Sequence, residues 1–129
     1  MATPDGLHHI TLHMARSADF PEGSARHGYS LRAPLDARGF IDPVRWKAAR
    51  SHCVVRRFWD GEPDRVGQLI HKPGGATGAT WAFDYNPDRD DDDEAGYRLG
   101  EHAFRPGEYV SIRDEDSALQ TFVVKSVDG

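Results

Sequence analysis

Three histidines are the best candidates for a nitrogen-rich metal site: His9, His13 and His102. Histidine nitrogens are common ligands of zinc and related metals. On a strand, residues four positions apart share a face but lie about 13 Å apart. His9 and His13 therefore cannot chelate one ion together, and a site would need a distant partner such as His102. The preferred interpretation is surface or half-buried histidines without a metal, with a histidine metal site as the alternative.

An acidic segment over residues 84–94 offers oxygen ligands for a hard cation such as Ca²⁺. Asp88, Asp90 and Asp92 alternate along it and are the candidate ligands. Counting from Asp84, the sixth and twelfth positions are arginine and alanine, whereas a calcium loop requires glycine and glutamate there. We therefore expect a solvated acidic loop, with a cation site as the alternative.

The single cysteine, Cys53, is the only thiol available for nucleophilic catalysis. Its neighbour His52 would point to the opposite face of a strand, so the pair is not a catalytic dyad. Val54 and Val55 follow it, which is typical of a buried and unreactive core thiol. The chain also contains no Gly-x-Ser-x-Gly motif. The sequence therefore assigns no catalytic residue.

Basic and aromatic residues are interleaved in the middle of the chain, and they form the candidate ligand-binding set. That set consists of Arg56, Arg57, Trp59, Lys72 and Trp81. Barrel folds that bind single-stranded nucleic acid combine aromatic platforms with a basic groove. The net charge of −5 and the acidic segment oppose phosphate binding. A nucleic-acid ligand is therefore an alternative, and nucleic acid is not the preferred partner.

The elements that must position these residues are mostly strands, because apolar residues recur with a period of two. Ile10, Leu12 and Met14 share one face, and His9 lies on the other. We expect a mainly β fold: a small antiparallel β-barrel or sandwich of about eight short strands. The predicted strands are Leu7–Arg16, His27–Ala33, Cys53–Trp59, Arg65–His71, a short strand from Thr80, Gly96–Phe104, Glu108–Arg113 and Leu119–Val127.

One short helix is predicted near residues 43–51, because Asp42 is a good N-cap and Pro43 suits the first helical position. Its Trp46 would dock it on the sheet. Two loops are also expected, a five-residue hairpin loop over 60–64 and a type II turn over Arg105–Glu108.

The length of 129 residues indicates a single domain spanning 1–129. One cysteine permits no internal disulfide, which fits the reducing cytoplasm. Neither a signal peptide nor an apolar run long enough to cross a membrane is visible, so no membrane association is expected.

Charge is distributed unevenly, with a net +4 over residues 45–72 and a net −6 over residues 84–101. Such a chain suits a polar protein partner or a self-complementary homodimer. The leading hypothesis is a non-catalytic binding or interaction module of unknown ligand, and no cofactor can be named. The alternatives are a metal-dependent enzyme or metal binder, and a barrel that binds single-stranded nucleic acid.

Overall fold

A computed structural model describes residues 7–18, 20–71, 81–85, 94–97, 103–113 and 119–128, with only the backbone of 94–97. These residues form eight strands and one short α-helix, α1 (Pro43–Ala49), which continues into the 3-10 turn η1 (Arg50–His52). The strands are β1 (Leu7–Met14), β2 (Ser24–Pro34), β3 (Val54–Trp59), β4 (Glu62–His71), β5 (Trp81–Asp84), β6 (Glu94–Tyr97), β7 (Tyr109–Arg113) and β8 (Leu119–Asp128). The predicted mainly β class with one short helix is confirmed.

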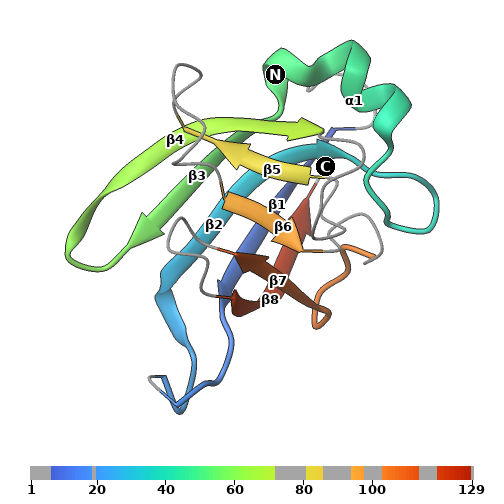
Figure 1. The fold of residues 1–129 in the computed structure, drawn as a ribbon. Coiled ribbons are helices and arrows are strands. Elements are labelled where there is room, and N and C mark those ends of the chain that lie inside the picture. The colour runs from blue at the N-terminus through green and yellow to red at the C-terminus, as the bar shows by residue number, and fades with distance from the viewer. Residues whose placement is uncertain are drawn as a thin grey trace.

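Every strand pairs antiparallel with the next strand in sequence, and β8 also pairs with β1. The result is a strongly curled sheet (Figure 1). The sheet is uneven: β1 pairs with β2 along its whole length, whereas β5 and β6 are four residues each. The strands β8 and β1 to β4, of six to eleven residues each, therefore form an extensive wall, and the wall from β5 to β7 is short.

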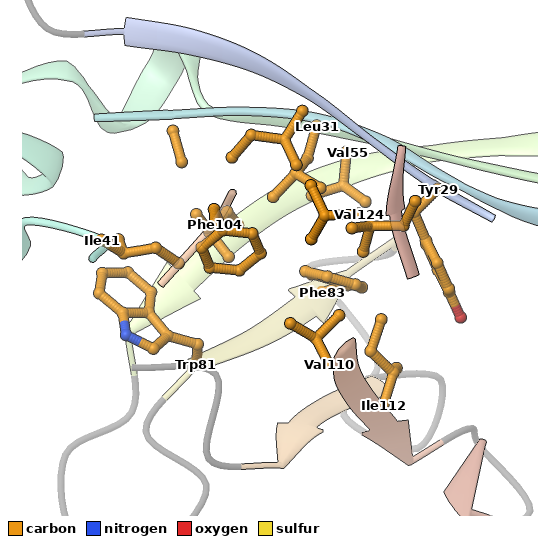
Figure 2. Close-up of a cluster of buried hydrophobic side chains, with 14 of the residues drawn as sticks. Tyr29, Leu31, Ile41, Val55, Trp81, Phe83, Phe104, Val110, Ile112 and Val124 are labelled. Carbon is orange, nitrogen blue, oxygen red and sulfur yellow. The ribbon is translucent and has the colours of Figure 1, made fainter. Parts of the chain in front are cut away.

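The inner face of the curled sheet holds the core. On β1, Ile10, Leu12 and Met14 are buried, while His9 and His13 point outward, as the period of two predicts. Figure 2 shows the centre of the core, where Phe83 lies among side chains from several strands. Burial of such side chains is the main contribution to folding, about 25 cal/mol for each Å² of apolar surface removed from water.

Helix α1 covers one end of the curled sheet (Figure 1). The carboxylate of Asp42 accepts hydrogen bonds from the backbone N–H groups of Val44 and Arg45, and Pro43 begins the helix, as predicted. The indole N–H of Trp46 donates to the backbone carbonyl of Leu69 over 2.8 Å. Trp46 therefore docks the helix on β4, which confirms the role expected from the sequence.

Two predicted strands have ends that differ by two or three residues, since the first strand ends at Met14 and the second begins at Ser24, and two further predictions were wrong. The hairpin between β3 and β4 has only Asp60 and Gly61 between the strands, not a loop over 60–64. Gly61 adopts a φ of +85°, which a tight two-residue turn requires and glycine readily accepts.

The sixth strand is Glu94–Tyr97, and residues 98–102 of the predicted strand Gly96–Phe104 lie outside the described residues. The prediction was wrong at Ala103 and Phe104, which are in no strand. Phe104 instead lies outside any strand, with its N–H bonded to the carbonyl of Gly39 over 2.7 Å and its ring in the core. The expected turn after it is confirmed, because the N–H of Glu108 donates to the carbonyl of Arg105 over 3.0 Å.

In the part of the chain that the structure describes, no helix has the length and apolar character that crossing a membrane requires.

Candidate ligand-binding site

The strand β3 divides the predicted basic and aromatic set between two faces. Val55 is fully buried on the inner face, so Arg57 and Trp59 also face inward, and Arg56 faces outward. The side chain of Arg56 is 61% exposed and lies 4.0 Å from the carboxylate of Asp64. Arg56 therefore cannot join Arg57 and Trp59 around one ligand.

The remaining aromatic of the predicted set, Trp81, lies in the core at the α1 end. It is 2% exposed, and its ring packs against Trp46 at 5.5 Å and His71 at 4.5 Å between ring centroids. Figure 2 places it beside Ile41. Trp81 thus presents no face to a ligand, and Lys72 lies outside the described residues.

At the other end of the sheet, four side chains from the loop after β1, from β2 and from β3 form a continuous stack. The guanidinium of Arg57 lies 4.2 Å from the centre of the Trp59 ring. The rings of His27 and Trp59 are nearly perpendicular with 4.7 Å between their centroids, and the Phe20 ring lies 4.7 Å from His27 between centroids. We call Phe20, His27, Trp59 and Arg57 the aromatic stack. Arg57 also donates a hydrogen bond to the carboxylate of Glu62 over 3.3 Å. The Arg57 guanidinium is therefore held by both a carboxylate and the Trp59 ring.

The aromatic stack borders a pocket of about 600 Å³, here called the open-end pocket. Its apolar wall comes from Met14, Phe20, Trp59 and Leu119. Its polar groups include Arg16, Gln120 and Thr121, so the described lining carries a cation and no carboxylate. Small-ligand sites have this character: a mostly apolar concavity with a few polar groups, often at the mouth of a barrel.

No family model, curated protein or solved structure matches this chain. Its function is therefore inferred from the chemistry of the described residues.

The candidate metal ligands do not converge. His9 forms a hydrogen bond with the Ser30 hydroxyl and lines a groove shared with Arg32, whereas His13 lines a different groove. Among the described residues, no three His, Cys, Asp or Glu side chains gather as a metal site would need. Asp88, Asp90, Asp92 and His102 lie outside the described residues.

Cys53 is a core thiol, as its sequence neighbours predicted. It is fully buried, and burial raises the pKa of the thiol to about 11. Its Sγ donates to the carbonyl of Ala49 over 3.5 Å. Because the thiolate is the nucleophile, Cys53 is poorly suited to covalent catalysis at neutral pH.

The sequence did not single out Met14, Phe20 and Leu119 of the open-end pocket, nor His27 of the aromatic stack. The period of two on β3 already places Trp59 on the inner face with Val55, and this signal separates Trp59 from Arg56. Phe20 lies in an irregular loop, where no periodicity indicates which way a side chain points.

Proposed function

We propose that the protein is a non-catalytic binding module, built as a small β-barrel, that takes a small ligand with a planar apolar part in the open-end pocket. The single observation that carries this proposal is the difference between the two ends of the sheet. At the α1 end, Trp46 and Trp81 pack against each other, and Trp81 is only 2% exposed. At the other end, Phe20 and Trp59 border a pocket instead.

The walls of this pocket are held in place before any ligand arrives. Trp59 contacts both the Arg57 guanidinium and the His27 ring, and His27 forms a hydrogen bond of 2.7 Å with Ser24. A preorganised aromatic wall loses little conformational entropy on binding, which favours affinity. A planar ring packed beside Trp59 would gain both burial and the geometric preference of aromatic pairs.

The other two hypotheses receive less support from this geometry. A nucleic-acid strand would need Arg56 and Trp59 on one face, and β3 turns them to opposite faces. A histidine metal site would need further ligands beside His9 or His13, and among the described residues no such group of three ligands gathers. A protein partner or homodimer and a cytoplasmic location remain proposals from the charge pattern and the single buried thiol.

A thermal-shift screen of planar small molecules tests the proposed function, using wild type and two lysine variants. Leu119→Lys places a charge in the pocket, and Val66→Lys is the matched control on an exposed position of β4. A ligand at about one hundred times its Kd stabilises the fold by about 2.7 kcal/mol, which raises Tm by several degrees. We expect compounds that stabilise wild type and the Val66 variant but not the Leu119 variant. Compounds that stabilise all three proteins equally, or no stabilising compound, would contradict the proposal.

A further inference from the structure

We propose that a second site, on the outer face of the sheet, binds a small oxyanion such as a phosphate or carboxylate group between His13 and Lys125. These two side chains line a groove of about 720 Å³ where the outer faces of β1, β7 and β8 meet the loop after β1. None of the four side chains of the aromatic stack lines this outer groove. The two sites adjoin each other, and they share Met14, Arg16 and Thr121, which line both.

The first observation is a bulge that sets the position of Lys125. Along the pairing of β1 with β8, Thr11 lies opposite Ser126 and Leu12 lies opposite Val124. Lys125 is therefore an extra residue without a partner position on β1. Such bulges bend a strand and redirect a side chain, and they occur frequently beside functional sites. Lys125 is exposed and lines the groove.

A second irregularity of the sheet falls beside the same groove. The register of β1 with β2 shifts between His13 and Met14, where Met14 pairs with Ser24. Ser24 and Ala25 thereby line the groove together with His13. Both breaks in the pairing of β1 thus lie within two residues of His13, beside the groove that His13 lines.

The electrostatics of the groove favour an anion. His13 is half-buried, and its pKa is lowered first by burial and then by the positive charge of Lys125. Arg16 is a third basic group in the described lining of the groove, and Glu22 is its one carboxylate. Within the described ranges, neither Lys125 nor Arg16 takes part in a salt bridge. An oxyanion placed between His13 and Lys125 would relieve their repulsion and accept charged hydrogen bonds from both.

The floor of the outer groove is apolar, which sets the size and nature of the ligand. Val123 lies opposite both His13 and Tyr109 on neighbouring strands, and Tyr109 is 58% exposed. An aromatic side chain exposed beside three basic groups fits a small organic molecule that carries an acidic group. The groove therefore provides apolar contact and charge recognition together.

The test is a titration of the intact protein with inorganic phosphate and, separately, with malonate at low ionic strength and pH 6.5. The observable is the ring Cε1–H signal of His13 in NMR spectra. Lys125→Gln removes the proposed contact, and Lys47→Gln makes the same chemical change on the exposed face of α1, far from the groove. Both positions are exposed, so both variants should fold.

We expect the His13 signal to shift and saturate with one or both anions, which also shows whether phosphate or carboxylate is preferred. Lys125→Gln should weaken binding about tenfold, the loss of one charged hydrogen bond, and Lys47→Gln should leave it unchanged. The inference is overturned if neither anion gives a saturable shift. It is also overturned if the two glutamine variants behave alike, because the effect would then be one of net charge alone.

Discussion

The Phe83→Ala variant is expected to lose about 3–5 kcal/mol of unfolding free energy, a large part of the stability of a small domain. Phe83 is fully buried and its ring packs against Tyr29 at 5.1 Å between centroids. It lies near the middle of the core cluster in Figure 2. It also comes from β5, a four-residue strand with few backbone pairs of its own. Removing the ring therefore leaves a cavity beside a short strand, which has few backbone hydrogen bonds to keep it in place.

Urea unfolding followed by circular dichroism measures this loss, and Tyr109→Ala is the matched control. Tyr109 is 58% exposed on β7, so its truncation should cost less than about 1 kcal/mol. Similar losses for the two variants would contradict the assignment of the core to the inner face.

The Gly28→Ala variant is expected to be destabilised by at least about 2 kcal/mol, because β1 and Phe58 leave no room for a side chain at this position. A Cβ atom there would lie 1.9 Å from the carbonyl oxygen of Leu12. It would also lie 3.1 Å from the ring of Phe58, which crosses the outer face toward His13. A backbone oxygen cannot rotate away, so the pairing of β1 with β2 has to shift.

The same unfolding experiment measures this effect, with Thr11→Ala as the control on the outer face of β1. Thr11 is half-buried, and replacing it with alanine adds no atom that could clash with a neighbour. A change below about 1 kcal/mol in unfolding free energy is therefore expected. A stability of Gly28→Ala within about 0.5 kcal/mol of wild type would show that the two strands do not approach as closely as described.

Features encoded by local residue chemistry were predictable from the sequence. Asp42 and Pro43 form a cap and a first turn without any tertiary partner, so the start of α1 was predicted correctly. The alternation on β1 assigned Leu12 to the core and His13 to the outer face for the same reason. These signals depend only on neighbours within a few positions along the chain.

Features fixed by contacts between distant residues were not predictable in the same way. Phe104 is held in the core by its backbone hydrogen bond to Gly39, which no local pattern around Phe104 encodes. The aromatic stack exists because the register of β2 with β3 places His27 opposite Trp59. That register joins residues more than thirty positions apart, and it is set by the packing of the whole sheet.

One error in the predicted site was avoidable. The candidate ligand-binding set combines Arg56 and Arg57 with Trp59 because they are close in sequence, but adjacent residues on a strand point to opposite faces. The strand assignment over 54–59 was correct, and applying its period would have kept Arg57 with Trp59 and removed Arg56. The outer groove, in contrast, depends on a bulge at Lys125 that the sequence does not signal.

The most direct test of the ligand pocket uses the indole N–H signals of the three tryptophans in NMR spectra. The probe is 8-anilinonaphthalene-1-sulfonate, which combines a planar naphthalene ring with an anionic group and so suits the aromatic wall and Arg16. Trp46 and Trp81 report on the α1 end, and Trp59 reports on the open-end pocket. We predict a saturable shift of the Trp59 signal alone, with the spectrum otherwise keeping its folded dispersion. Shifts of Trp46 and Trp81, general broadening of the kind that loosened states give with this dye, or no saturable shift of Trp59 would contradict the account.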